Sequence, residues 1–219
     1  MKKILITGAN RGIGLELCRQ LTVRGEEVIA VCRRSNSELQ ALNLRVIEDI
    51  DVGSTDSVKS VQKQLGDMKL DWLINNAGIL SIETLDDLNF EAMEQQFRVN
   101  ALGPLRMTTA LLPNLSTGTK VGIITSRMGS IEDNTSGSYY GYRMSKAAVN
   151  MAGKSLAHDL KEQDIAVFLL HPGMVATDMT GGRGVPVQKS ASGLIQRMDE
   201  LGLPDSGSYW HAEGESLPW

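Results

Sequence analysis

The sequence has few of the features that mark disulfide-rich or metal-binding proteins. It contains only two cysteines, Cys18 and Cys32, which have neither a CxxC spacing nor a metal-ligand spacing. We therefore interpret both as reduced, buried thiols of an intracellular protein. No pair of its three histidines has metal-ligand spacing either, so we expect no metal site.

Long hydrophobic runs and clusters of one charge are also absent. The apolar run in "MKKILITGAN" ends after a few residues, far short of a secretory signal or a membrane span. We interpret it as a first β-strand and expect a cytoplasmic protein. The net charge is −4, and lysine and arginine are scattered along the chain, which argues against nucleic acid as a partner.

The composition is that of an ordinary globular protein. The chain has 219 residues, of which 42% are hydrophobic and 22% are charged. This length can bury a substantial core without disulfides or metals. We find no internal repeat, no low-complexity segment and no linker, so we expect residues 1–219 to form a single domain.

Short apolar runs alternate with longer amphipathic segments. Strands are expected at 3–7, 27–32, 44–48, 72–76, 120–125 and 165–171, and helices at 14–24, 54–66, 86–98, 101–113, 142–162 and 187–201. A loop near 178–188 and a strand-like segment at 206–219, with a turn at Gly214, complete the chain. This alternation predicts an α/β, doubly wound Rossmann fold with a parallel sheet of about seven strands flanked by helices.

The first loop is rich in glycine. "TGANRGIG" (7–14) joins the first strand to the first helix, with Gly8, Gly12 and Gly14 spaced G-x-x-x-G-x-G. Glycine permits a tight turn and a close backbone approach, while the helix N-terminus presents amides to a pyrophosphate. Because any strand-to-helix turn can need glycine, the loop alone is weak evidence for a dinucleotide site.

The second strand ends in "VCRRS" (31–35), where an NAD-binding protein usually carries an acidic residue. Arg33 and Arg34 can instead pair with a 2′-phosphate, and Arg11 adds a cation nearby. Arginines at a strand end are also common on solvated surfaces. Their position favours NADP(H) over NAD(H).

Three tyrosines occur in "YYGYRMSKAA" (139–148). Only Tyr142 lies four residues before a lysine, Lys146, which places both on one face of a helix. A nearby ammonium would lower the high pKa of the phenol and suit it to proton transfer. The same spacing is frequent on exposed helices, and Tyr139 and Tyr140 are interpreted as the wall of a loop.

Further polar residues follow other strands, at the same edge of the predicted sheet. They are Ser126, the "NNAG" segment (75–78), the "HPGMVATDM" segment (171–179), and Asn100 at a junction between helices. With "TGANRGIG", "DV" (51–52) and the Tyr142–Lys146 pair, they follow the order of motifs in the short-chain dehydrogenase/reductase family. The chain resembles this family over its whole length, and most of all its C-factor and sniffer-like carbonyl reductase subgroup.

The resemblance implies an enzyme that transfers hydride between NADP(H) and a carbonyl or alcohol. Tyr142 would be the general acid/base, and Lys146 would lower its pKa and bind the nicotinamide ribose. Ser126 would hold the substrate oxygen, and Asn100 would belong to a proton relay. The implied cofactor-binding residues are Gly8, Asn10, Arg11, Gly12, Ile13, Gly14, Arg33, Asp51, Val52, Asn76, Ala77, Gly78, Tyr142, Lys146, Pro172, Gly173, Val175 and Thr177.

Two departures from the family pattern concern the substrate pocket. Ser126 precedes Tyr142 by sixteen residues, which extends the loop at 131–139, and the segment after Thr177 is short. We therefore expect an open site that tolerates varied carbonyls.

The alternative function is a signalling or regulatory protein whose output is cofactor binding rather than turnover. We also expect a homodimer or homotetramer joined through 101–113 and 142–162, where Ala147, Ala148, Ala152 and Gly153 permit close helix packing. The same small residues could instead pack on the sheet of a monomer.

Overall fold

The computed structural model describes residues 1–219 and contains one parallel sheet of seven strands. The strands are β1 (Lys3–Thr7), β2 (Glu27–Val31), β3 (Arg45–Ile47), β4 (Trp72–Asn75), β5 (Lys120–Ile124), β6 (Ala166–His171) and β7 (Ser208–His211). Their order is β3-β2-β1-β4-β5-β6-β7. The single-domain Rossmann fold expected from the sequence is confirmed.

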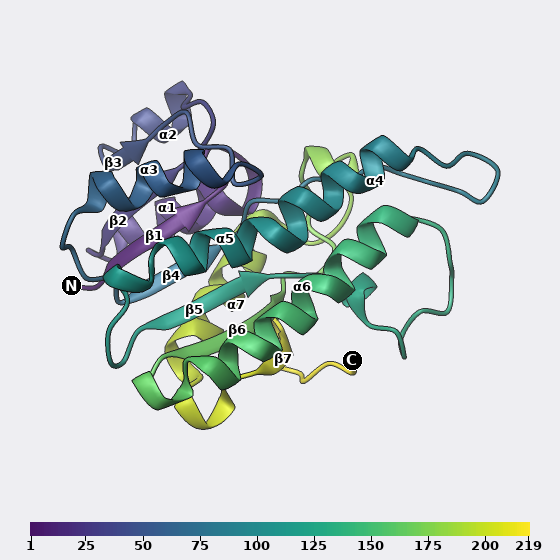
Figure 1. Ribbon diagram of the computed structural model, residues 1–219. Helices are drawn as coiled ribbons and strands as arrows, with labels where there is room; N and C mark the ends of the chain where they lie inside the picture. Colours follow the sequence, from purple (N-terminus) through teal and green to yellow (C-terminus); the bar gives the residue numbers. More distant parts are fainter.

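Helices cover both faces of the sheet (Figure 1). On one face lie α3 (Thr55–Leu65), α5 (Leu102–Ala110) and α6 (Tyr140–Asp159), and on the other lie α1 (Gly12–Val23) and α7 (Val187–Glu200). The short helix α4 (Phe90–Gln96) extends beyond the sheet as the base of an arm. None of the helices combines the length and apolarity needed to cross a lipid bilayer.

The core has two halves because strand side chains alternate between the faces of the sheet. In β1, Leu5 packs into the cluster under α3, α5 and α6, whereas Ile4 and Ile6 pack under α1 and α7. All three are fully buried. Burial on both faces explains why the strands are continuous apolar runs rather than alternating ones.

The stretch between β4 and β5 differs in detail from the sequence-based expectation. Helix α4 continues through a π-helical turn at Phe97–Ala101 directly into α5, so no loop separates them. The structure also contains a four-residue helix, α2 (Ser37–Gln40), that the sequence does not predict; Asn36 caps it by accepting from the Leu39 N–H at 2.9 Å. The remaining helices begin and end within about three residues of the expected positions, the usual uncertainty of helix boundaries.

The strand order reverses between β1 and β4: β2 and β3 are added on one side of β1, and β4 to β7 on the other. Open α/β sheets bind ligands at such a switch point, beyond the carboxyl ends of the strands. The segment after β7 turns back at Gly214, where φ is +102°, and Trp210 pairs with Ser216. This turn agrees with the sequence-based expectation.

Candidate active site

The glycine loop lies at the switch point and is held by the segment that follows β4. The Asn76 side chain donates from Nδ2 to the Thr7 and Gly8 carbonyl oxygens, at 2.9 and 3.2 Å. The Thr7 hydroxyl accepts from the backbone N–H groups of Asn76 and Ala77, at 3.0 and 3.1 Å. The glycine loop and the "NNAG" segment, both predicted to bind the cofactor, are therefore hydrogen-bonded to each other.

Glycine is required at two positions of this loop. Gly8 has φ of +64°, and a Cβ there would lie 2.8 Å from the Ala77 Cα. A Cβ on Gly14 would lie 2.2 Å from the Gly8 carbonyl oxygen. Helix α1 begins after Arg11 with no side-chain cap and no acidic residue in its first turn. A compact backbone cradle with uncapped amides fits the pyrophosphate of a dinucleotide.

The end of β2 is tied to the same loop. Asn10 donates from Nδ2 to the Arg34 carbonyl oxygen at 2.9 Å, and Asn36 donates to the Asn10 carbonyl oxygen at 2.8 Å. Arg11, Arg33 and Arg34 are exposed, and none of them forms an ion pair. Their guanidinium groups are therefore free to meet an anion.

The "DV" segment and the loop after β6 complete the rim. Val52 is buried, while the exposed Asp51 accepts from the Gly53 N–H at 2.8 Å. Thr177 reaches the glycine loop, since a Cβ on Gly12 would lie 3.3 Å from its methyl carbon. Val175 is buried, and its carbonyl oxygen accepts from the Thr180 hydroxyl at 2.6 Å.

Ser126, Tyr142 and Lys146 are brought together beyond the end of β5. Ser126 lies just past the strand, whereas Tyr142 and Lys146 share the buried face of α6. The Lys146 ammonium nitrogen lies 5.6 Å from the Tyr142 ring centroid and donates to the Ile124 carbonyl oxygen at 2.9 Å. The exposed fractions of Ser126, Tyr142 and Lys146 are only 7%, 8% and 4%.

Burial governs the protonation of both titratable groups. It raises the pKa of Tyr142 to about 12, although contact with the Ser126 hydroxyl lowers it somewhat. Burial also lowers the pKa of Lys146 to about 8, because no carboxylate pairs with this ammonium. Burial is therefore the dominant influence on the Tyr142 pKa, and the Ser126 hydroxyl, rather than Lys146, is the group that opposes it. At neutral pH the phenol is protonated and the lysine is mostly charged.

Asn100 joins α6 to the segment after β4. Its side chain accepts from the Ile79 N–H at 2.9 Å and donates to the Ile79 carbonyl at 2.8 Å and the Ser145 hydroxyl at 3.1 Å. A Cβ on Gly78 would lie 3.3 Å from the Asn100 Oδ1 and 3.8 Å from the Lys146 Nζ. The Asn100 amide and the Lys146 ammonium thus both lie close to Gly78.

The three tyrosines of the "YYGYRMSKAA" motif have different environments. Tyr139 precedes α6 in the left-handed conformation, with φ of 55°, and its N–H donates to the Glu83 carbonyl oxygen at 2.8 Å. Tyr140 is 37% exposed. Only Tyr142 joins the buried group.

Sequence reasoning missed two parts of this region. The loop at 130–132 is held by the C-terminal segment, because the Ile131 and Glu132 N–H groups and the Ser130 hydroxyl donate to the Trp219 carbonyl oxygen at 3.0–3.1 Å. Glu83 and Gln96, both 1% exposed, pack against the start of α6. No motif or helical spacing connects these segments in the sequence.

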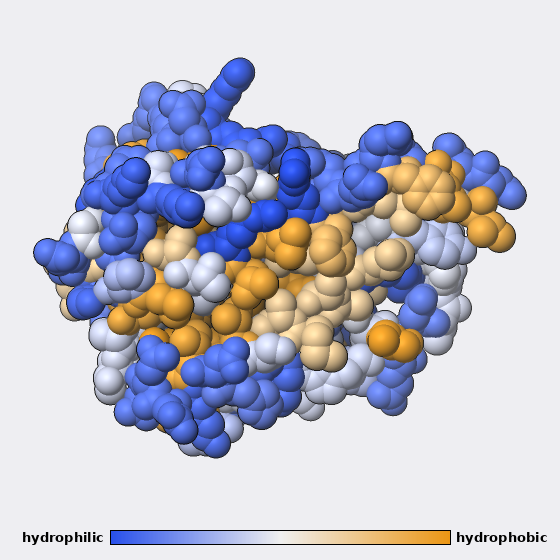
Figure 2. All heavy atoms as spheres, in the orientation of Figure 1, coloured by the Kyte–Doolittle hydropathy of each residue, from blue (hydrophilic) through white to orange (hydrophobic).

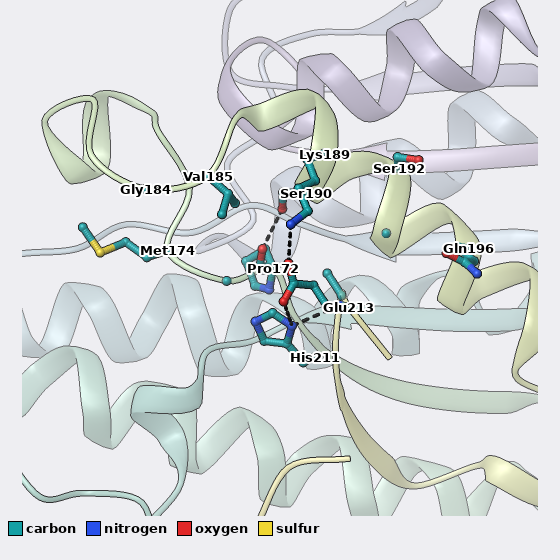
Figure 3. Close-up of a pocket in the computed structure, with 13 residues that line it drawn as sticks. Pro172, Met174, Gly184, Val185, Lys189, Ser190, Ser192, Gln196, His211 and Glu213 are labelled. Carbon is teal, nitrogen blue, oxygen red and sulfur yellow. Dashed lines mark hydrogen bonds and ion pairs between the residues drawn. The ribbon is translucent and has the colours of Figure 1, made fainter. Parts of the chain in front are cut away.

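A separate cavity of about 670 Å³ opens between the loop after β6, the start of α7 and the end of β7 (Figure 3). Its lining includes Pro172 and Gly173 from the predicted cofactor segment, but none of the predicted catalytic residues. His211 lines it and contacts His171 edge-on, with ring centroids 5.0 Å apart. Burial lowers the pKa of His171 to about 3, so this imidazole is neutral at physiological pH.

Comparisons with known proteins agree with this geometry. The family model "short chain dehydrogenase" matches residues 2–185. The chain belongs to the short-chain dehydrogenase family. Its fold and motif order are those of this family of oxidoreductases, as the resemblance in the sequence indicated.

Similar proteins are known from several organisms. A 1-hydroxy-2-glutathionyl-2-methyl-3-butene dehydrogenase of Rhodococcus sp. is 42% identical over all of both chains. The C-signal of Myxococcus xanthus is 44% identical, covering 68% of this chain and 93% of that protein. The Drosophila melanogaster carbonyl reductase Sniffer matches at a TM-score of 0.90 and 31% identity, over all of both chains.

A carbonyl reductase from chicken fatty liver, solved with NADPH bound, matches at a TM-score of 0.91 and 33% identity. The match covers 100% of this chain and 99% of that one. The similarity to carbonyl reductases therefore extends over the whole fold and is not limited to the dinucleotide-binding half.

Proposed function

We propose that this protein is an NADP(H)-dependent carbonyl reductase or alcohol dehydrogenase. The observation that carries the proposal is the buried group of Ser126, Tyr142 and Lys146, in which a lysine without a carboxylate partner lies beside a phenol. A protein that only bound a dinucleotide would not need this group. The complete set therefore favours turnover over a purely regulatory role.

The bound nicotinamide would supply or accept the hydride. Ser126 holds the substrate oxygen, and Tyr142 donates a proton to it during reduction. The Tyr142 phenol carries its proton at neutral pH, but burial raises its pKa to about 12, so it is a weak acid and donation requires stabilisation of the phenolate as it forms. As the proton leaves, negative charge develops on the phenol next to a buried ammonium.

Lys146 stabilises that charge. An ammonium buried without a counter-ion is costly, as its lowered pKa of about 8 indicates. A phenolate beside it relieves this cost, so the pair is better matched to the transition state than to the resting enzyme. Asn100 fixes the lysine's surroundings and would anchor the route by which a proton returns.

The cofactor preference rests on three exposed arginines. Arg11 lies in the glycine loop and Arg33 and Arg34 follow β2, where the adenosine ribose is expected, and none forms an ion pair with a carboxylate. Two similar carbonyl reductases were solved with NADPH or NADP. Both observations support NADP(H) over NAD(H).

A homodimer or homotetramer is part of the proposal. Apolar side chains gather on the face formed by α4, α5 and α6 (Figure 2). Met144 and Met151 on α6 are 57% and 69% exposed, and Phe90 on α4 is 63% exposed. Gly153 does not belong to this face: a Cβ there would lie 2.6 Å from Leu169 of β6, so it packs on the sheet. Light scattering would detect a mass of two or four chains.

The test is a fluorescence titration with NADPH and NADH, followed by turnover of a carbonyl and alcohol panel with the tighter cofactor. The panel should include small aldehydes, bulky ketones and the glutathione-conjugated alcohol named for the Rhodococcus relative. We expect tighter NADPH binding and reduction of several carbonyls of different size. Strict use of one small substrate would contradict the open site.

Tyr142→Phe separates turnover from binding. Removing the proton donor should lower kcat by about a thousandfold. The NADPH dissociation constant should change far less, because the substitution leaves the glycine loop and the arginines intact. Tyr140→Phe is the matched control and should keep wild-type kcat. Unchanged turnover by Tyr142→Phe would refute the proposed mechanism.

A further inference from the structure

Glu83 is a buried carboxylate that the proposed mechanism does not use. It is 1% exposed and forms no ion pair. Its Oε1 accepts from the Gln96 amide nitrogen at 2.7 Å and from the Ser81 hydroxyl. Its Oε2 accepts from the Gly141 N–H at 3.2 Å. Burying a carboxyl group without a cation costs folding free energy, so the presence of Glu83 at this position calls for an explanation.

Gln96 completes a closed set of bonds with Glu83. The Gln96 Oε1 accepts from the Ser81 N–H at 3.1 Å, and its amide nitrogen also donates to the Ser81 hydroxyl at 2.6 Å. The hydrogen-bond partners thus require both Glu83 carboxyl oxygens and the Gln96 Oε1 to accept and the Gln96 amide nitrogen to donate. The arrangement links the arm after β4 to α4, across thirteen residues of sequence.

The Glu83–Gln96 pair lies at the start of the helix that carries Tyr142. Helix α6 begins at Tyr140, and its preceding residue, Tyr139, provides no side-chain cap. Glu83 fills that role from a distant segment, accepting from the first turn of α6 with its carboxylate and from the Tyr139 N–H with its carbonyl. The positive end of the helix dipole favours a negative charge there.

The backbone entering α6 needs this support. Ser138 and Tyr139 both have positive φ, 54° and 55°, a conformation that residues other than glycine adopt only when their surroundings impose it. A Cβ on Gly141 would lie 2.5 Å from the Gln96 amide nitrogen, so α4 and α6 meet without a gap. Tyr142 is the next residue.

We propose that Glu83 and Gln96 are positioning residues that set the height and orientation of Tyr142 over the Ser126–Lys146 group. The inference deepens the proposed function and rests on it. The Glu83 carboxylate contacts Ser81, Gln96 and Gly141 and none of Ser126, Tyr142 or Lys146. It acts by fixing the first turn of α6, and misplacement of a catalytic group by about 1 Å can cost up to a hundredfold in rate.

The bond pattern supplies a specific test, because exchanging the two side chains preserves it. In Glu83→Gln alone, the introduced amide nitrogen must face either the Gly141 N–H or the Gln96 amide, so two donors are opposed. In the double variant Glu83→Gln with Gln96→Glu, the amide introduced at position 83 accepts from Gly141 and donates to the new carboxylate at position 96. That carboxylate still accepts from Ser81.

We expect Glu83→Gln to lower kcat about tenfold per NADPH-binding site, with the NADPH dissociation constant unchanged. The exchanged variant should recover kcat to within about threefold of the wild type. The matched control exchanges the exposed neighbours on the same helix, Glu94→Gln with Gln95→Glu, and should leave kcat unchanged. Full kcat in Glu83→Gln, or no recovery in the exchanged variant, would overturn the inference.

A second readout does not depend on turnover. The chain has four tyrosines, so 13C labelling of their phenolic carbons gives a simple spectrum, in which Tyr142→Phe identifies the Tyr142 signal. Glu83→Gln should move that signal and the exchange should return it. If the wild type reduces no carbonyl, the proposed function fails, while this spectrum still decides the positioning role. An unchanged Tyr142 signal in Glu83→Gln would refute it.

Should Glu83→Gln fail to fold, the exchanged variant decides the question. A folded exchanged protein with the wild-type Tyr142 signal supports the pairing, since it keeps the bonds and moves only the charge. An exchanged protein that also fails to fold overturns it.

Discussion

The two halves of the site at the carboxyl ends of the strands differ in composition: one consists mainly of backbone and the other of side chains. Around β1 and β4 the proposed cofactor cradle is made of backbone: glycines without room for a Cβ, carbonyls that accept from Asn76, and the uncapped amides of α1. Beyond β5, the candidate catalytic group is made of side chains buried where polar groups are costly. Binding one common cofactor needs only a shape, whereas moving a proton needs groups whose charge is controlled by their surroundings.

The largest effect that would break this comparison is Gly14→Ala. Its Cβ would lie 2.2 Å from a backbone oxygen and 2.5 Å from the Asn76 amide nitrogen, so the cradle must open. We expect NADPH binding to weaken at least about 100-fold, with a lower melting temperature. Gly202→Ala is the control, because its Cβ meets only Pro204 at 3.6 Å. Both variants are compared by fluorescence titration and thermal unfolding, and equal behaviour would contradict a backbone cradle.

A charge reversal sharpens the comparison on the cofactor side. Arg33→Glu should weaken NADPH binding about tenfold, the value of a lost charge-assisted contact. NADH binding should stay the same or improve, because NADH has no 2′-phosphate. Lys63→Glu removes an exposed cation from α3 and should leave the ratio of the two dissociation constants unchanged. A loss shared equally by NADPH and NADH would point to damage rather than to phosphate recognition.

The smallest expected effect is a pH dependence confined to the catalytic side. Lys146 has a folded pKa of about 8, so raising the pH through 8 removes the charge that stabilises the developing phenolate. Tyr142, with a pKa of about 12, remains a proton donor throughout that range. The kcat/KM for carbonyl reduction should therefore be constant below pH 7 and fall to about half near pH 8.

The control for this profile is Lys146→Arg, whose guanidinium does not titrate. Its kcat/KM should be lower overall but lack the decline near pH 8. A wild-type profile that stays flat up to pH 10 would show that Lys146 does not govern the reaction.

Much of the fold could be predicted from the sequence because its signals are local. Buried parallel strands are apolar runs, and the Tyr142–Lys146 spacing fixes their common helix face. The sequence could not reveal how far burial would raise the pKa of Tyr142, because burial depends on how the strands and α6 pack around it. Nor could it place Gly153 on the sheet, since a small residue suits a helix–helix contact equally well.

The long-range bonds were beyond sequence reasoning for a different reason. Glu83 meets Gly141 across fifty-eight residues, and the Trp219 carbonyl meets the Ser130 hydroxyl across eighty-nine. Neither pair follows a period or a motif. Such contacts become visible only when the sheet has brought separate connections to one edge.

The π-helical turn at Phe97–Ala101 has a consequence for how this site tolerates insertions and deletions. Such a turn accommodates one more residue than the α-helical turn it replaces, so α4 and α5 are joined as if a single residue had been added to a continuous helix. Deleting that residue would convert the turn to regular α-helix and rotate α4 relative to α5 by about 100° around the helix axis. Asn100 and Gln96 lie near opposite ends of the turn, so they could no longer face α6 together. The length of this short segment, rather than its composition, keeps the two contacts in register.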